Sequence, residues 1–152
     1  MRRRRGDWHN WPFEPLPVLR ALGARGVDYI LIGGLAAVLQ GSPLPTYDID
    51  LAPAASVRNR DLLAAALADL GARTIVKTKS KSVLTPYGYV DLHFAVAGFD
   101  TYASLRRNAV GVDLEPGLRV LASPLRDIIR SRAAAGDTRQ LPALLATLEA
   151  PR

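Results

Sequence analysis

The stretch Thr46-Tyr47-Asp48-Ile49-Asp50-Leu51 places two aspartates two positions apart in a segment that otherwise has the pattern of a β-strand. Because side chains alternate between the two faces of a strand, Asp48 and Asp50 project from one face, and Ile49 and Leu51 point to the core. Two carboxylates on one face repel each other unless a cation lies between them, and such oxygen ligands suit Mg²⁺ or Mn²⁺. The spacing alone is common in proteins, so a solvent-facing pair on an edge strand is the alternative.

A third carboxylate and a glycine pair strengthen the metal-site interpretation. Asp91 lies inside the apolar strand pattern of residues 89–95, where a carboxylate is costly unless it is paired or bound to metal; the alternative is an edge strand. His93 shares its strand face and either supports the site or is only structural. Gly33-Gly34 stands between an apolar run and a helix, where backbone N–H groups can approach a phosphate closely. A plain strand-to-helix turn is the alternative for the glycines.

The rest of the chain predicts one mixed domain of helices and strands over residues 15–152, after a basic and aromatic tail over residues 1–14. Helices are expected over residues 16–22, 35–39, a segment capped by Ser56 and ended by Gly71, and residues 102–106, 124–135 and 139–148. Strands are expected over residues 27–32, 47–52, 74–76, 82–85, 89–95, 110–114 and 118–121. This order predicts an α/β (α+β) domain with a mixed β-sheet flanked by helices and followed by C-terminal helices.

Composition excludes several classes of protein. With 152 residues, 49% hydrophobic and 22% charged, the chain resembles an ordinary soluble globular domain, and no apolar run reaches the roughly 20 residues that cross a bilayer. The absence of cysteine excludes disulfides and thiolate zinc sites, and two histidines argue against a histidine-rich metal centre. The basic start is not followed by an apolar signal core, so we expect a cytoplasmic protein without membrane contact.

The net charge of +6 and the pI near 10.2 favour an anionic partner such as a nucleotide or RNA. Most of the excess is arginine, however, and an arginine-rich, alanine-rich chain can also reflect only the base composition of its genome. Charge therefore supports a nucleic-acid partner without establishing one.

The combination of motifs is more specific than its parts. Residues 30–37 and 46–51 together resemble the signature of DNA-polymerase-beta-like nucleotidyltransferases, in which a glycine pair precedes Asp-x-Asp by a short helix and an acidic residue follows on a later strand. Residues 62–73, 87–92 and 120–129 resemble the AbiEii-like branch, which includes MenT-type toxins. The resemblance covers about residues 16 to 149 and implies a minimal nucleotidyltransferase fold.

The resemblance also implies an activity: transfer of a nucleoside monophosphate from an NTP to an acceptor, with Mg²⁺ or Mn²⁺. Residues implied to bind metal and act in catalysis are Asp48, Asp50 and Asp91, and residues implied to bind the nucleotide are Gly33, Gly34, Thr46 and Arg132. Toxin members often modify tRNA and are paired with an antitoxin protein. The leading hypothesis is therefore a toxin that transfers a nucleotide to RNA, with tRNA as the expected acceptor.

Some positions depart from the pattern of the toxin branch. Leu44 stands where the branch has arginine, Arg132 where it has lysine, and Gln140 where it has a carboxylate. Two alternatives follow. In the first, the same chemistry serves a protein or small-molecule hydroxyl, such as that of an aminoglycoside, although the +6 charge argues mildly against a cationic acceptor. Otherwise the fold binds nucleotide without catalysis.

Overall fold

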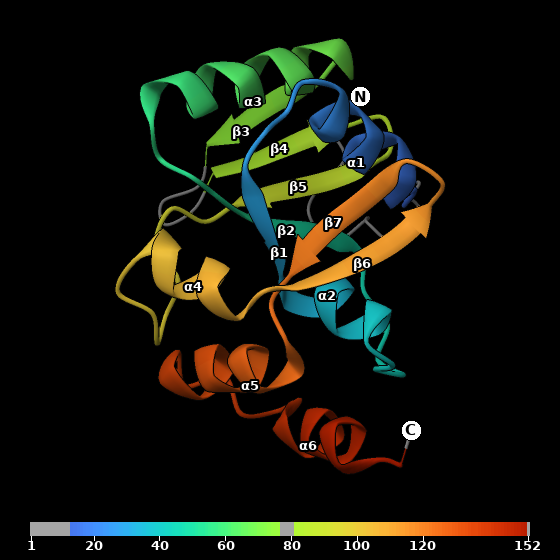
Figure 1. Cartoon of the computed structure of the whole chain (residues 1–152), viewed down its shortest axis with the longest axis vertical. Helices are drawn as coiled ribbons and strands as arrows, with labels where there is room; N and C mark the ends of the chain where they lie inside the picture. The colour runs from blue at the N-terminus through green and yellow to red at the C-terminus, as the bar shows by residue number, and fades with distance from the viewer. Residues whose placement is uncertain (1–12, 77–80, 152) are drawn as a thin grey trace.

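The computed structural model describes residues 13–76 and 81–151 (Figure 1). The helices are α1 (Pro15–Ala24), α2 (Gly33–Leu39), α3 (Val57–Asp69), α4 (Tyr102–Asn108), α5 (Leu125–Ala134) and α6 (Leu141–Glu149). The strands are β1 (Tyr29–Ile32), β2 (Asp48–Pro53), β3 (Arg73–Val76), β4 (Lys81–Thr85), β5 (Gly88–Leu92), β6 (Val110–Glu115) and β7 (Leu118–Ala122). No helix in the described parts of the chain is both long and apolar enough to span a bilayer.

The strands form one seven-stranded sheet in the order β3-β4-β5-β2-β1-β7-β6. β2 runs parallel to β5 and β1 runs parallel to β7, whereas the remaining neighbours are antiparallel. Figure 1 shows α5 and α6 together at one end of the molecule and α3 at the other. The sequence-based order of helices and strands is confirmed, and so is the predicted mixed sheet flanked by helices with a C-terminal helical pair.

The differences from prediction lie at element ends. The strand expected to continue to residue 95 ends at Leu92, although the His93 N–H still donates a hydrogen bond to the Leu51 carbonyl at 2.8 Å. The last helix begins at Leu141 and not at residue 139, with Pro142 in its first turn. Most of the expected N-terminal tail lies outside the described residues. At its end, Phe13 packs against the core and the Glu14 N–H donates to the Tyr87 carbonyl at 2.8 Å.

The apolar face of the central strands forms the main core. Ile49, Leu51 and Val90 are 0% exposed, as the alternation of β2 predicted. They pack in one cluster with buried side chains of α1 and α3, among them Leu19 and Leu63. The opposite face of β2 and β5 carries the acidic residues, so the sheet separates the core beneath α1 and α3 from the polar site.

Candidate active site

The two aspartates of β2 lie in the middle of the sheet. β2 pairs with β1 on one side, where Asp50 is opposite Ile32, and with β5 on the other, where Asp50 is opposite Asp91. β5 is itself enclosed between β4 and β2. The edge-strand alternative is therefore wrong for both strands. Because paired residues of parallel strands share a face, Asp48, Asp50 and Asp91 belong to the same side of the sheet.

The backbone at Gly33 and Gly34 lies so close to side chains of residues 46–50 that only glycine fits. Gly33 follows β1 with φ +70°, and a Cβ built on it would lie 2.6 Å from Asp50 Oδ2. A Cβ on Gly34 would lie 2.8 Å from Thr46 Oγ1. Any larger residue would therefore displace the Asp50 carboxylate or the Thr46 hydroxyl. The glycines do more than form a plain turn, because they allow the backbone at the start of α2 to lie against the acidic strand.

Two cavities meet at this point. The first, here called the aspartate cavity, has a volume of about 170 Å³ and is lined by Gly34, Ala37, Ser42, Leu44, Pro45, Thr46, Tyr47, Asp48, Asp50, Arg132, Gln140 and Leu144. The second, here called the histidine cavity, has a volume of about 370 Å³ and is lined by Ile32, Gly33, Asp50, His93, Ala95, Val96, Ala97, Ser123, Asp127, Ile128, Ser131, Arg132 and Ala135. Asp50 and Arg132 belong to both linings, so the two cavities share one wall.

His93 is bound to Asp50. Its Nε2 lies 2.9 Å from Asp50 Oδ1, with the histidine side chain 32% and the aspartate side chain 23% exposed. The hydrogen bond to Asp50 raises the pKa of His93 above its ordinary value, partial burial opposes this, and the charges of Asp50 and Asp91 add to the increase. His93 thus contacts a carboxylate that lines both cavities.

Arg132 of α5 supplies a cation to both cavities. Its Nη1 donates to Asp137 Oδ2 at 3.3 Å, and its side chain is 21% exposed. Its Nε is buried without a hydrogen-bond partner among the described residues, as is the Ser123 hydroxyl in the histidine cavity. A buried guanidinium donor without a partner is costly, and a phosphate oxygen would satisfy it. This observation fits the binding of an anionic group beside Asp50.

Asp91 is placed differently from the other expected site residues. It is 5% exposed, accepts a hydrogen bond from the Ser82 hydroxyl, and is not part of the described lining of either cavity. The remaining expected site residues all line one cavity or both. The structure therefore assembles the glycine pair, Thr46, Arg132 and the β2 aspartates, and puts Asp91 beneath the surface.

The donor set suits a divalent metal in part. Asp48 and Asp50 project from one strand face into the aspartate cavity and offer the carboxylate oxygens that Mg²⁺ prefers. The described residues contain no cluster of three or more histidine, cysteine, aspartate or glutamate side chains arranged around a metal. A two-carboxylate site completed by phosphate oxygens and water fits this arrangement, since Mg²⁺ commonly keeps water and substrate phosphates as ligands.

Some lining residues were not expected from the sequence. Ser123, two residues before α5, and Asp127 and Ser131, within α5, bring a polar side to the histidine cavity. Asp127 is 5% exposed and accepts a hydrogen bond from Asn108 Nδ2 at 3.2 Å. The available signal was an acidic residue among the apolar positions of a helix, but an aspartate in a first helical turn is also ordinary capping chemistry.

The mixed sheet with its flanking helices is the fold of nucleotidyltransferases of the polymerase-beta-like type. The sequence model of the aminoglycoside-2''-adenylyltransferase family matches residues 16–116 of the chain. The chain belongs to this family and is a nucleotidyltransferase. The match includes β1, α2, β2 and β5, and ends before α5, from which Arg132 comes. A search of curated proteins found no match to the chain.

Solved structures show the same fold at low sequence identity. The antibiotic-resistance factor ANT(2'')-Ia in complex with adenylyl-2''-tobramycin is 16% identical, with a TM-score of 0.59 over 88% of this chain and 86% of that one. The lincosamide antibiotic adenylyltransferase LnuA, bound to lincomycin, is 14% identical, with a TM-score of 0.64 over 90% and 99%. A protein of Thermotoga maritima assigned as a nucleotidyltransferase is 17% identical, with a TM-score of 0.60 over 92% and 97%.

Proposed function

We propose that this nucleotidyltransferase moves AMP from ATP to a hydroxyl group of a small molecule. The observation that carries the proposal is the aspartate cavity, where Asp48 and Asp50 face Gly34 and Arg132 beside a second cavity that shares Asp50. One cavity is suited to a triphosphate and the other to an acceptor. The family to which the chain belongs supports an adenylyl donor and a small-molecule acceptor.

The sizes of the cavities support this division. Small-molecule sites commonly have volumes of about 300–1,000 Å³. The histidine cavity, at about 370 Å³, lies in that range, whereas the aspartate cavity, at about 170 Å³, suits the triphosphate portion of a nucleotide better than a whole ligand. The backbone at Gly34, the Thr46 hydroxyl and the Arg132 guanidinium can donate to phosphate oxygens in the aspartate cavity.

The reaction follows from this placement. The acceptor hydroxyl oxygen forms a bond to the α-phosphorus of ATP, and the bond from that phosphorus to the oxygen bridging the β-phosphate breaks, so pyrophosphate leaves. Asp48 and Asp50 would hold a Mg²⁺ or Mn²⁺ ion, which would neutralise charge on the triphosphate. The hydroxyl proton leaves to water in the histidine cavity, and His93 holds the Asp50 carboxylate in place at the shared wall. Asp91 lines neither cavity, so in this proposal it assists only through its negative charge beside Asp50 on the same face of the sheet. Arg132, which reaches the cavities from α5, binds and orients the phosphates in this proposal.

RNA is the second candidate acceptor, and the observation that favours it is the net charge of +6. A tRNA-modifying toxin with an antitoxin partner is the corresponding biological role. It has weaker support than the small-molecule acceptor, because the family match is to a small-molecule adenylyltransferase family. The departures from the toxin branch, at Leu44, Arg132 and Gln140, also fall together in the aspartate cavity.

Label transfer separates these possibilities. The purified protein is incubated with magnesium and each α-labelled NTP in turn, with tobramycin, lincomycin or total RNA as acceptor, and Asp50→Asn serves as the inactive control. Label from ATP on a small molecule, absent with Asp50→Asn, is the expected result. Label entering a tRNA-sized band instead would move the assignment to the RNA acceptor. Magnesium-dependent ATP binding without transfer to any acceptor class would indicate a fold that binds nucleotide without catalysis.

A further inference from the structure

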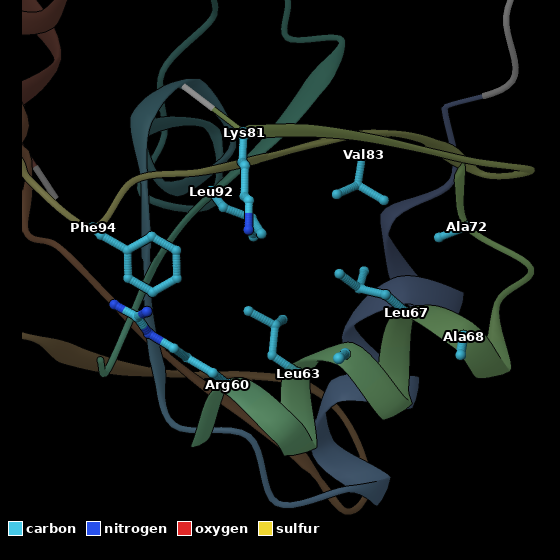
Figure 2. Close-up of a pocket in the computed structure, with 10 residues that line it drawn as sticks. Arg60, Leu63, Leu67, Ala68, Ala72, Lys81, Val83, Leu92 and Phe94 are labelled. Atoms are coloured by element: carbon cyan, nitrogen blue, oxygen red, sulfur yellow. The ribbon is translucent and has the colours of Figure 1, made fainter. Parts of the chain in front are cut away.

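A third cavity lies on the other face of the sheet, away from the carboxylates. This cavity, here called the distal pocket, has a volume of about 440 Å³ and lies between α3 and strands β4 and β5 (Figure 2). Its lining residues are Arg60, Leu63, Ala64, Leu67, Ala68, Ala72, Lys81, Val83, Leu92 and Phe94. Among the lining residues in the described part of the chain, none also lines the aspartate cavity or the histidine cavity.

Strand alternation separates the distal pocket from the active site. Leu92 and Phe94 line the pocket, whereas His93 lines the histidine cavity and Asp91 pairs with Asp50 on that same side of the sheet. On β4, Val83 lines the pocket and Ser82 binds Asp91 on the other side. The sheet is therefore the wall between the two sites, and a ligand in the distal pocket would not compete directly with ATP.

The floor of the distal pocket is apolar. Leu63 and Val83 are each 4% exposed, Leu92 is 6% and Leu67 is 8% exposed, and Figure 2 shows their side chains around the open space. Three alanines of α3 and the following loop keep the space open, because their side chains are too small to fill it. The apolar side chains around an open volume of this size lack packing partners on one side, and a hydrophobic ligand would supply them.

The mouth of the distal pocket is positively charged. Lys81 points into the pocket from β4 in Figure 2, and Arg60 of α3 extends to Phe94, where its guanidinium carbon lies 4.8 Å from the ring centroid. The described lining residues include no acidic side chain. Two cations beside an apolar floor, with no carboxylate among the described lining residues to balance them, are complementary to a molecule that has an apolar body and an anionic end.

We propose that the distal pocket binds a small apolar or aromatic monoanion, such as a carboxylate, with its body on the leucine and valine floor and its charge between Arg60 and Lys81. Such a ligand is distinct in chemistry from ATP, which is polar along most of its length and highly charged. The proposal does not depend on the acceptor assigned to the active site, because the residues that carry it lie on the opposite face of the sheet.

The first test compares two probes of nearly equal size. The full chain is titrated with 4-phenylbutanoate and with its uncharged analogue 4-phenylbutanamide, and binding is followed by amide chemical shifts in two-dimensional NMR. We expect saturable shifts that are largest at Leu67, Val83 and Leu92, with the acid binding at least about five-fold more tightly than the amide. Equal affinity of the two probes would overturn the charge assignment. Largest shifts at Gly34, Thr46 and Asp48 would overturn the location.

Matched variants give a second test. Ala68→Trp places an indole in the distal pocket from an exposed helix position, and it should lower the affinity for 4-phenylbutanoate more than ten-fold. Ala103→Trp, on the exposed side of α4, should leave this affinity unchanged. Lys81→Met should lower the affinity for 4-phenylbutanoate about three-fold, and Lys81→Arg should leave it unchanged. Arg58→Met, on the same helix as Arg60, removes a charge outside the pocket and is the control that should also leave it unchanged. Unchanged binding in Ala68→Trp would refute the pocket. Asp48→Asn should keep probe binding, so loss of adenylyl transfer and loss of the distal ligand are separable.

Discussion

The two faces of β2 and β5 have opposite roles although their residues alternate along the same strands. On one face, Asp48 and Asp50 line a cavity with Arg132, and His93 is bound to Asp50 at 2.9 Å. On the other face, Ile49, Leu51 and Val90 are 0% exposed within the core formed with α1 and α3. Residues that pack in the core and residues that line the proposed active site therefore alternate along the same strands.

This difference indicates which substitutions can change chemistry without unfolding the domain. Side chains on the catalytic face interact mainly with a bound anion or cation, so we expect their removal to lower turnover more than stability. Side chains on the core face stabilise the fold through packing contacts, so their truncation creates a void and lowers stability. The predictions below use pairs of variants to test whether the two faces are independent.

The largest expected effect is on the catalytic face. Asp50→Asn removes one of the two carboxylates that line the proposed triphosphate site. We expect adenylyl transfer to fall by roughly 10³-fold or more, because several kcal/mol of charge stabilisation are lost. The measurement is the initial rate of label transfer at saturating ATP, together with the thermal midpoint. Asp61→Asn, on the exposed surface of α3, is the matched control and should transfer at the normal rate. Normal transfer by Asp50→Asn would remove this residue from the catalytic machinery.

The neighbouring position on the core face should behave in the opposite way. Leu51→Ala leaves a void at a side chain that is 0% exposed, and we expect the free energy of unfolding to fall by about 2–5 kcal/mol. The rate of transfer per folded molecule, measured below the transition temperature, should change much less than in Asp50→Asn. Urea titration gives the stability. A collapse of transfer in the folded Leu51→Ala protein would show that the two faces are coupled.

Gly33→Ala tests the contact between the glycine pair and Asp50. Gly33 and Gly71 have nearly the same backbone angle, φ +70° and +71°, but only Gly33 has a neighbour that an added Cβ would strike, Asp50 Oδ2 at 2.6 Å. Gly71→Ala should cost about 1 kcal/mol of stability from backbone strain alone. Gly33→Ala should cost more and also reduce transfer at least about ten-fold, because the carboxylate must move. If Gly33→Ala and Gly71→Ala lost the same stability and the same transfer activity, the Asp50 carboxylate would be able to move without effect on either property.

Most of the fold and much of the site could be predicted from sequence because their signals are local. Strand alternation placed Asp48 and Asp50 on one face, and the order of helices and strands followed from apolar periodicity and from the glycines and prolines at element ends. The end of β5 was less predictable. Residues 93–95 continue an apolar pattern, but the chain leaves the ladder after His93.

The acceptor and the burial of Asp91 could not be predicted, because both depend on residues distant in sequence. Asp91 is enclosed by its pairing with Ser82 of β4, which no spacing within β5 reveals. The histidine cavity receives Ser123 and Asp127 from the far end of the chain. The toxin branch was favoured by sequence motifs, yet the family match supports the small-molecule alternative better than that leading hypothesis. Acceptor specificity depends on cavity walls that motifs do not describe.

A smaller effect is expected from Arg132→Lys. Lysine keeps the positive charge but loses the planar fork and the buried Nε, which has no hydrogen-bond partner among the described residues. We expect the KM for ATP to rise about ten-fold and stability to change little, because the group is placed for an anion and not for packing. Steady-state kinetics over a range of ATP concentrations provide the measurement. Arg126→Lys, exposed on α5, is the control, and equal KM values for the two variants would remove Arg132 from the phosphate site.

The smallest effect concerns the ion pair on the catalytic face and its dependence on pH. Hydrogen bonding to Asp50 raises the pKa of His93 in the folded protein, so this pair stabilises the fold fully below the unfolded value of about 6.5 and loses that contribution as pH rises through the higher folded value. With both groups partly exposed, the contribution should be at most about 1 kcal/mol.

Urea unfolding from pH 5.5 to 9 in the presence of a chelator should therefore show wild type losing its advantage over His93→Gln as pH rises. The advantage should be absent at every pH when Asp50 is already asparagine, so the four proteins of the double-mutant cycle isolate the pair. A difference between wild type and His93→Gln that stays constant across this range would mean that His93 contributes packing and not charge. The catalytic face would then resemble the core face at this position, and the separation between the two faces would be less complete than strand alternation implies.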